Sequence, residues 1–238
     1  MHAIILAGGK GTRLKPYTMS FPKPLVPIGQ YPIIEIIIRQ LAYYGFKRIT
    51  ISTGYLAELI EAYCGSGEKW NVGIEYVRED TPLNTAGALK LVKDCEENLL
   101  VMNGDVLTNI DLGKLYSLHV SMGNKATVAS KIRESKIDFG VLKLDEKDFL
   151  SDYIEKPVYT FLVSMGVYVL SSDVINFISE GESIGMPDLL LRLEKSGERV
   201  FCYKSDCYWL DIGRVDDYER AQEDFEINKH NFLRDNEE

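Results

Sequence analysis

The chain has 238 residues, a net charge of −9 and a charged-residue share of 26%. This length allows one large α/β domain or two small ones, and the acidic charge argues against a nucleic-acid binder, which needs a basic surface to neutralise phosphates. A small anionic substrate is compatible with this acidic charge, because a few local cations can hold it. The sequence contains no signal peptide and no apolar stretch of transmembrane length, so we expect a cytoplasmic protein.

Short apolar strands and helices alternate along the first half of the chain. We expect strands at 3–7, 48–53, 73–77 and 98–105, and helices at 32–45, 57–63 and 86–95, with Thr85 as the N-cap of the last helix. This alternation predicts a mostly parallel sheet covered by helices on both faces. Ligands of such sheets bind beyond the carboxyl ends of the strands. The glycine-rich stretch after residue 7 and the Asn-Gly-Asp tip at 103–105 both fall there.

The second half of the chain is less regular. Strand-like stretches at 126–132, 140–144 and 163–170 are expected to add antiparallel strands that build a second lip of the same cleft. No linker, repeat or low-complexity segment interrupts the chain. We therefore expect a single domain over residues 1–228, followed by a polar C-terminal tail over residues 229–238.

The stretch GGKGTR at residues 8–13 directly follows the first expected strand. It matches neither common phosphate-binding fingerprint: Gly11 stands where a P-loop has Ser or Thr, and Leu14 stands where a Rossmann loop has its third glycine. A plain tight turn is the simpler interpretation. Against it, Arg13 and Lys23 stand among three prolines, which makes the loop both stiff and basic. Such a loop suits phosphate, because glycines let backbone N–H groups approach phosphate oxygens and the cations balance their charge.

Over residues 6–25 the sequence resembles the sugar-1-phosphate nucleotidyltransferases, also called NDP-sugar pyrophosphorylases. The shared pattern is Gly-Gly-x-Gly-Thr-Arg-Leu from Gly8, then Pro-x-Thr from Pro16, then Pro-Lys-Pro from Pro22. The similarity continues in chain order through TPLNTAGAL (81–89), NGD (103–105), FGV (139–141), IEKP (154–157) and YWLDIGRVDDY (208–218).

The resemblance implies an α/β fold, a Rossmann-like (glycosyltransferase-A-type) three-layer sandwich with a mostly parallel central sheet and a smaller antiparallel sugar-binding part. In appearance the chain is closest to the mannose-1-phosphate and heptose-1-phosphate guanylyltransferases. The resemblance also implies site residues. The expected catalytic residues are Arg13, Lys23, Asp105, Lys156 and Asp211. The expected nucleotide-binding residues are Leu6, Ala7, Gly8, Gly9, Gly11, Thr12, Arg13, Lys23, Gly54, Pro82, Leu83, Asn84, Thr85 and Gly87. The expected sugar-phosphate-binding residues are Asn103, Gly104, Gly140, Glu155, Lys156, Ser164 and Gly166.

The reaction implied by the resemblance is attack of a sugar 1-phosphate oxygen on the α-phosphorus of a nucleoside triphosphate, with loss of pyrophosphate. Both reactants are anions, so charge neutralisation and alignment would supply most of the catalysis. Lys23 would bridge the α-phosphate and the nucleophile, Arg13 would stabilise the triphosphate, and Lys156 would fix the sugar phosphate. Asp105 and Asp211 would hold Mg²⁺ between the phosphates, since a hard cation prefers oxygen ligands.

The histidines and cysteines lie outside these motifs. His2, His119 and His230 are expected to be packing or surface residues, which leaves histidine acid–base catalysis without a candidate. The four cysteines have no zinc-ligand spacing and are expected to be packed thiols.

Each motif residue also has a simpler structural interpretation. Asp105 could cap a helix, Asp211 could be a turn acid, and the pair at 155–156 could be an exposed ion pair of little energetic value. Three such coincidences in the right chain order are less probable than any one of them. The functional interpretation is therefore the stronger one.

The sequence does not determine which nucleobase and which sugar the protein uses. We expect GTP with mannose or heptose 1-phosphate, and dTTP, UTP or CTP with glucose 1-phosphate is the alternative. Ser164 stands where the family often has a sugar-contacting Asn, which leaves the identity of the sugar open. A non-catalytic regulator that binds nucleotide sugars is an alternative from another class, and the missing third glycine disfavours a Rossmann oxidoreductase. The expected partners are these small molecules, with no nucleic acid and no membrane, and homodimerisation remains open.

Overall fold

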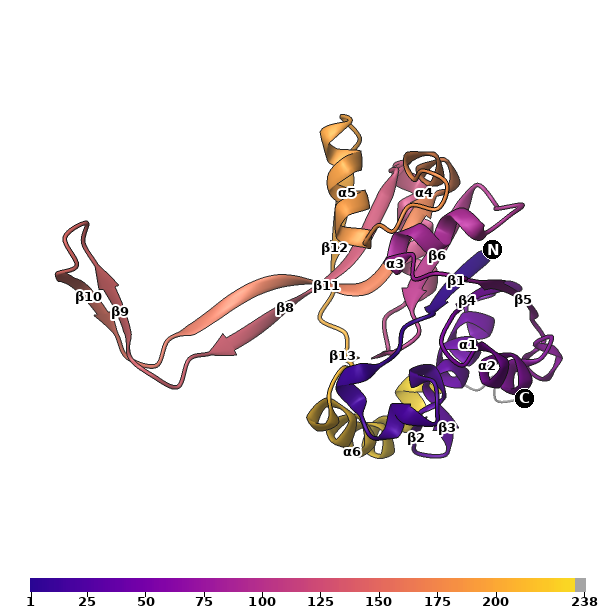
Figure 1. Cartoon of the computed structure of the whole chain (residues 1–238), viewed down its shortest axis with the longest axis horizontal. Helices are drawn as coiled ribbons and strands as arrows, with labels where there is room; N and C mark the ends of the chain where they lie inside the picture. The colour runs from indigo at the N-terminus through magenta and orange to yellow at the C-terminus, as the bar shows by residue number, and fades with distance from the viewer. Residues whose placement is uncertain (234–238) are drawn as a thin grey trace.

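A computed structural model describes residues 1–233 of the chain (Figure 1). Its centre is a seven-stranded sheet with parallel pairing on each side of one antiparallel strand, β11. In spatial order the strands are β12 (Val200–Lys204), β8 (Ala126–Lys136), β11 (Val158–Ser171), β6 (Asn98–Asn103), β1 (His2–Ala7), β4 (Arg48–Thr53) and β5 (Gly73–Arg78). The mostly parallel central sheet of the predicted α/β class is confirmed.

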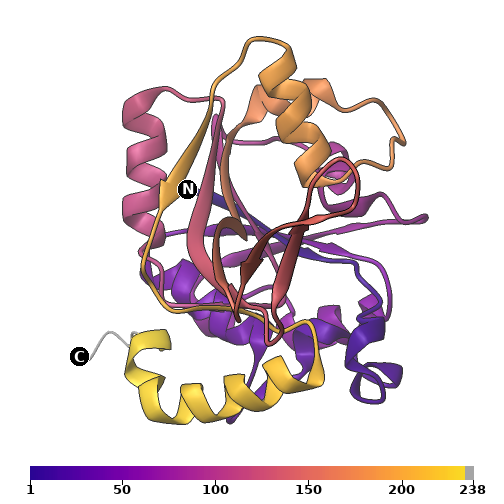
Figure 2. The same ribbon diagram turned by 90° about the vertical axis from the view of Figure 1, so that its left-hand side faces the viewer.

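Helices cover both faces of this sheet, so the body has three layers (Figures 1 and 2). One face packs against α1 (Ile33–Tyr43), α2 (Ala57–Cys64), α4 (Leu112–Met122) and α6 (Val215–Phe232). The other face packs against α3 (Asn84–Gly87) and α5 (Met186–Lys195). Along β1, Ile4 belongs to one core and Ile5 to the other, because successive side chains of a strand point to opposite faces. A strand buried on both faces explains the continuous apolar run at the start of the sequence.

Three two-stranded sheets complete the fold. They pair β2 (Pro27–Ile28) with β3 (Tyr31–Pro32), β7 (Val106–Thr108) with β13 (Trp209–Asp211), and β9 (Val141–Leu144) with β10 (Leu150–Ile154). Within residues 1–233, no helix combines the length and the apolar character needed to cross a membrane.

The strands of the second half depart from the prediction. The outer parts of β8 and β11 leave the body as a long hairpin that carries β9 and β10 at its end (Figure 1). Every residue from 131 to 164 is exposed or only half-buried. We call residues 131–164 the arm. The predicted second lip of the cleft is therefore wrong for this structure, because the hairpin projects away from the body instead of folding over it.

The helix expected at 86–95 is also shorter than predicted. The α-helix covers Asn84–Gly87, and a 3₁₀ turn continues over Ala88–Leu91. Thr85 does not cap this helix; its hydroxyl accepts a hydrogen bond from the backbone N–H of Met186 (2.8 Å) and so helps to start α5. The segment before α5 packs against α3, where Ala86 N donates a hydrogen bond to Ile184 O. This tertiary contact outweighs the local helix propensity that predicted a longer helix.

The predicted C-terminal tail begins inside α6, which ends at Phe232. Asn228 has a non-helical backbone (φ −119°) inside this helix. The chain nevertheless continues as a packed segment, because Phe232 is completely buried and stacks on Phe225. Residues 234–238 of the predicted tail lie outside the described residues.

Candidate active site

A cleft of about 260 Å³ opens at the carboxyl ends of β1 and β6. Its walls come from the loop after β1, the loop after β5 and the tip after β6. The lining residues are Leu6, Ala7, Gly8, Gly9, Lys23, Pro24, Glu79, Pro82, Asn84, Thr85, Asn103, Gly104 and Asp105. The cleft thus lies at the strand ends where ligands of open α/β sheets bind.

The glycine-rich loop is fixed by a few internal contacts. Gly11 adopts a left-handed backbone (φ 60°), and its carbonyl accepts hydrogen bonds from the Thr18 hydroxyl (2.7 Å) and from Leu14 N (3.0 Å). Leu14 is fully buried and anchors the loop to the core. A Cβ on Gly11 would lie 2.9 Å from Thr18, so the turn requires glycine for space as well as for its backbone angle.

Lys23 lies at the base of the cleft between two carboxylates. Its side chain is largely buried, its ammonium pairs directly with Asp105, and its Nζ lies 3.8 Å from Asp211 Oδ1. A largely buried ammonium held by two carboxylates is pre-organised to bind phosphate, because the side chain has already lost its flexibility on folding. This cluster is the most concentrated set of charged groups along the cleft.

The two aspartates come together through the small β7–β13 sheet. Asp211 pairs in register with Val106, and Ile212 N donates to Asp105 O (3.1 Å). Partial burial, followed by the nearby charge of Asp105, raises the pKa of Asp211 above its ordinary value, although Lys23 opposes this shift. Asp105 is not a helix cap here, because β7 follows it directly; Asp211 ends β13 at a turn, where Gly213 N donates to its backbone carbonyl (2.8 Å), while its side chain faces Lys23.

The tip after β6 also carries polar atoms that the protein leaves unpaired. Asp105 Oδ1 and Asn103 Oδ1 are buried and have no hydrogen-bond partner within the described structure. Buried oxygens of this kind are costly unless a donor or a cation satisfies them. The described residues contain no group of three His, Cys, Asp or Glu side chains that could hold a metal by themselves. Two carboxylates with a free oxygen fit a Mg²⁺ that takes its remaining ligands from phosphate and water.

Arg13 lies next to this cluster. A Cβ on Gly213 would come within 3.4 Å of its guanidinium, and the charge of Arg13 acts to lower the pKa of Asp211. The structure therefore brings together four of the five expected catalytic residues: Arg13, Lys23, Asp105 and Asp211. The fifth, Lys156, lies on the arm.

The expected nucleotide-binding residues fall into two groups. Eight of them line the cleft: Leu6, Ala7, Gly8, Gly9, Lys23, Pro82, Asn84 and Thr85. The other six, Gly11, Thr12, Arg13, Gly54, Leu83 and Gly87, lie behind or beside its walls. Gly54 supports the loop from behind, since a Cβ there would lie 2.8 Å from Gly8 O. A Cβ on Gly87 would lie 2.3 Å from Glu182 O, so the side of Gly87 that a side chain would occupy faces the body.

The expected sugar-phosphate residues are split between the cleft and the arm. Asn103 and Gly104 line the cleft. Gly166 packs on Asn103, because a Cβ at this left-handed position (φ 70°) would lie 2.6 Å from Asn103 Nδ2. Ser164 stands at the root of the arm, where its hydroxyl donates to Tyr168 Oη (3.1 Å).

The remaining three sugar-phosphate residues, Gly140, Glu155 and Lys156, lie near the outer end of the arm, where β8 and β11 meet β9 and β10. Gly140 is packed against Tyr153 of the same hairpin, since a Cβ there would lie 2.2 Å from the tyrosine hydroxyl. None of the three belongs to the cleft lining of this chain.

Glu79 lines the cleft but was missed by sequence reasoning. Its carboxylate accepts hydrogen bonds from Ser52 Oγ (3.1 Å) and Leu83 N (2.9 Å), which fix it beside Gly8. A single glutamate after a strand carries no motif. The signal that could have found it is its place at the carboxyl end of an expected strand, immediately before the TPLNTAGAL segment.

The family model for nucleotidyl transferases matches residues 2–228. UTP–glucose-1-phosphate uridylyltransferase of Synechocystis sp. is 33% identical over 93% of this chain, which spans 62% of that relative's length. D-glycero-alpha-D-manno-heptose 1-phosphate guanylyltransferase of Aneurinibacillus thermoaerophilus is 32% identical over 95% of this chain and 99% of the relative. The chain thus corresponds to about three fifths of the first relative and to nearly all of the second.

Solved structures show the same architecture. HddC from Yersinia pseudotuberculosis superposes with a TM-score of 0.71 at 27% identity, covering 94% of this chain and 99% of HddC. HddC complexed with GMP-PN superposes with a TM-score of 0.68 at 25% identity and the same coverage. Together with the match over residues 2–228, the cleft at the strand ends and the four charged residues beside it show that this chain belongs to the nucleotidyl transferase family.

Proposed function

We propose that this protein transfers a nucleoside monophosphate from a nucleoside triphosphate to a sugar 1-phosphate, releasing pyrophosphate. The observation that carries the proposal is Lys23, which is held between Asp105 and Asp211 at the base of a cleft walled by the glycine-rich loop. A sugar 1-phosphate oxygen forms the new bond to the α-phosphorus as the bond to the pyrophosphate oxygen breaks. The nucleophile is already an anion at neutral pH, so the protein does not need to supply a base.

Each charged residue has a role in this transfer. Lys23 neutralises the α-phosphate and aligns the incoming phosphate, a role suited to a cation whose position is already fixed. Arg13 binds the triphosphate and then the departing pyrophosphate, because its planar guanidinium can bind two phosphate oxygens at once. The glycine-rich loop supplies backbone N–H groups, and Lys156 binds the phosphate of the sugar.

Asp105 and Asp211 are the residues that would hold Mg²⁺. Bound there, the ion would offset the negative charge that develops on the phosphates during transfer. The unpaired Asp105 Oδ1 and the carboxylate of Asp211 support this assignment. Until phosphate and metal bind, the ammonium of Lys23 offsets the negative charge of the two carboxylates.

The base is guanine in this proposal, and Glu79 is the residue that selects it. Guanine presents two adjacent hydrogen-bond donors on its Watson–Crick edge, and a carboxylate can accept both. Uracil and thymine present one donor between two carbonyl oxygens, so one carboxylate oxygen would face a carbonyl. The Ser52 and Leu83 contacts orient Glu79 without using all its lone pairs. The HddC structure with a guanine nucleotide analogue also supports this choice.

The sugar is mannose 1-phosphate or a heptose 1-phosphate of manno configuration. Support comes from the heptose-1-phosphate guanylyltransferase that this chain matches over nearly its full length. Nucleoside triphosphates and sugar phosphates are intracellular metabolites, so we place the reaction in the cytoplasm. We also infer that the protein acts as a homodimer, because its exposed arm needs a surface to pack against.

A substrate grid tests the proposal. Pyrophosphate release is measured with Mg²⁺ and each of GTP, UTP, dTTP and CTP, combined with mannose, heptose and glucose 1-phosphates. We expect release with GTP and a manno-configured sugar, and we expect Glu79→Gln to lower activity with GTP much more than with UTP. Release with UTP or dTTP and glucose 1-phosphate alone would overturn the choice of base and sugar. Tight nucleotide-sugar binding with no release anywhere in the grid would favour the non-catalytic regulator.

A further inference from the structure

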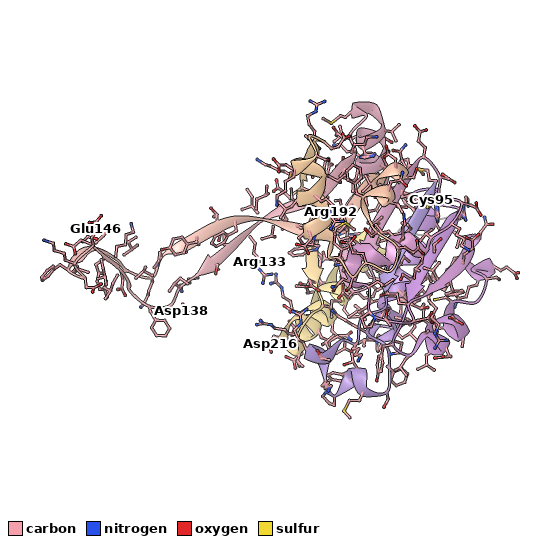
Figure 3. The ribbon with its side chains drawn as sticks, turned by 45° about the horizontal axis from the view of Figure 1, so that its top comes forward. Cys95, Arg133, Asp138, Glu146, Arg192 and Asp216 are labelled. Carbon is pink, nitrogen blue, oxygen red and sulfur yellow. The ribbon has the colours of Figure 1, made fainter. Side chains whose placement is uncertain are left out.

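The arm is a two-stranded hairpin that the body of its own chain does not support. Figure 3 shows Asp138 and Glu146 on its outer part, well away from the body that carries Cys95 and Arg192. Backbone pairing of β8 with β11 continues without a shift from Ser164–Ser130 to Val158–Lys136. An isolated two-stranded hairpin is only marginally stable in water, so this one needs a further surface to pack against.

The arm carries the apolar side chains that such packing requires. Its tip face comprises Leu142, Leu144, Leu150 and Tyr153, which are 53–61% exposed and share one side of β9 and β10. Seven more large apolar residues of the arm are also exposed: Ile132, Phe139, Phe149, Val158, Tyr159, Phe161 and Leu162. Side chains of this size expose on the order of 100 Å² each, which gives roughly 1,000 Å² of apolar surface on one arm. Large exposed apolar patches of monomers mark interaction sites.

The cleft, in turn, receives no side chain from the arm. All its lining residues lie between positions 6 and 105, and none comes from the arm. Lys156, assigned above to the sugar phosphate, is 58% exposed and forms an ion pair with its neighbour Glu155 (3.9 Å) on the outer arm. The cation that the proposed reaction needs is therefore present in the chain but absent from the cleft of that chain.

We propose that a second copy of this chain receives the arm, and that Lys156 of one copy completes the cleft of the other. This inference rests on the proposed function for the role of Lys156. Each chain carries both an unsupported arm and a cleft that lacks Lys156. A two-fold axis would place the arm of each copy at the cleft of the other, so both contacts form twice in one dimer. Two arms that each bury on the order of 1,000 Å² reach or exceed the 1,200–2,000 Å² of a standard stable interface.

Complementation between two inactive variants tests the exchange. Lys23→Ala disables the cleft and leaves the arm intact, whereas Lys156→Ala disables the arm and leaves the cleft intact. The two chains are co-expressed with different tags, and the mixed dimer is isolated on both tags. We expect each homodimer to lose most activity and the mixed dimer to recover about half of the wild-type rate, because one of its two sites pairs an intact cleft with an intact arm. Asp211→Asn replaces Lys23→Ala if that variant does not fold.

The outcomes separate the two proposals. Wild-type activity without recovery in the mixed dimer would show that the arm serves its own cleft or no cleft, and would overturn the exchange. A fully active Lys156→Ala homodimer would overturn it as well. A wild type that is inactive across the substrate grid would instead count against the proposed function, and the two measurements below still decide whether the arm is exchanged.

A covalent trap tests the same contact without any enzyme assay. Lys156→Cys on one tagged chain and Pro82→Cys on the other place a thiol on the arm and a thiol at the rim of the cleft. Mild oxidation is expected to give a disulfide-linked dimer only when both variants are mixed. Each variant alone, and Lys156→Cys mixed with Ser121→Cys on α4, are the controls for the native thiols such as the exposed Cys202. Absence of the specific link would contradict the exchange.

Sedimentation analysis tests the apolar contact. We expect the wild type at about twice the 27.0 kDa mass of one chain, and Leu142→Glu at the mass of a single chain. Leu191→Glu is the matched control, because Leu191 is also 56% exposed but lies on α5 of the body. A monomeric wild type, or equal effects of the two substitutions, would overturn the proposal.

Discussion

Lys23 Nζ lies 3.8 Å from Asp211 Oδ1, although the two residues come from opposite ends of the chain. The contact forms because β13 returns from the C-terminal part to pair with β7, directly after the Asn-Gly-Asp tip. One cation therefore links the glycine-rich loop, the tip after β6 and the C-terminal segment. The cluster exists only when the whole fold is assembled, and the predictions below depend on it.

Lys23→Ala is expected to lower kcat by about 10²–10³-fold, the loss typical for removal of one pre-organised group that stabilises transition-state charge. Steady-state kinetics with Mg²⁺ and the preferred substrate pair measure the change. Lys90→Ala, a lysine of the 3₁₀ turn outside the cleft, is the control and is expected to retain activity. A Lys23→Ala enzyme with unchanged kcat would contradict the role assigned to Lys23.

Removal of divalent cations is expected to abolish transfer and leave the fold intact, because the metal would be held by only two protein side chains. Chelation followed by addition of Mg²⁺ should remove and then restore pyrophosphate release, with little change in the far-UV circular dichroism. Asp211→Asn should raise the Mg²⁺ concentration needed for half-maximal activity. Full activity in the presence of excess chelator would rule out the metal assignment.

Gly54→Ala is expected to damage both stability and nucleotide binding. Its Cβ would lie 2.8 Å from Gly8 O, and a backbone atom cannot move aside without shifting the glycine-rich loop. Overpacking of this kind costs about 1–3 kcal/mol of unfolding free energy, and we expect a raised KM for the triphosphate as well. Gly73→Ala is the control, since its nearest contact would be an ordinary 3.7 Å. Equal denaturation midpoints and KM values for both variants would refute the close packing of Gly54 on Gly8.

The unfolding free energy is expected to fall as the pH drops below about 6.5. His2 and His119 are completely buried, and burial is the main cause that lowers the pKa of each below the ordinary value of 6.5. The contacts of His119 satisfy a neutral ring, in which Nε2 donates to Asn98 Oδ1 and Nδ1 accepts from the Thr127 hydroxyl. The unfolded chain therefore takes up these protons first, so the stability present above pH 6.5 is lost as the pH falls toward the folded-state pKa values.

Each histidine contributes a slope of up to about 1.4 kcal/mol per pH unit in that range. Urea denaturation between pH 5 and 8 measures the slope, and His119→Gln is expected to reduce it. His230→Gln is the control, because that side chain is exposed. Stability that rises on acidification through this range would contradict the burial of neutral histidines.

The sequence predicted the sheet because buried strands leave local patterns, whereas the residues of the charged cluster came from the resemblance to the family, since their meeting depends on the pairing of β13 with β7. Apolar runs marked the buried parallel strands, and the Gly-Gly-x-Gly-Thr-Arg-Leu motif marked the loop that brings Arg13 next to Gly213 and Asp211. Asp105 could be placed at a strand end by the same reasoning.

The direction of the arm could not be predicted in this way. Alternating Leu142 and Leu144 predict a strand with one apolar face, but the pattern does not say whether that face packs on its own body or on another molecule. Glu79 was missed because no motif marks it, and its place in the cleft comes from contacts with Ser52 of β4 and with Leu83 of its own loop. Thr85 was misassigned for a similar reason, since its partner Met186 is distant in the chain.

The proposed reaction moves the α-phosphate of GTP onto the sugar 1-phosphate, and a labelling measurement follows that phosphate. The protein is incubated with Mg²⁺, GTP labelled with ³²P at the α-position and a manno-configured sugar 1-phosphate, and the products are separated by anion exchange. We expect the label to appear in a nucleotide sugar, with an equal amount of unlabelled pyrophosphate, and we expect Lys23→Ala to form almost none of either. Label that remains in GTP, or appears in free GMP whether or not the sugar phosphate is present, would contradict the proposed reaction.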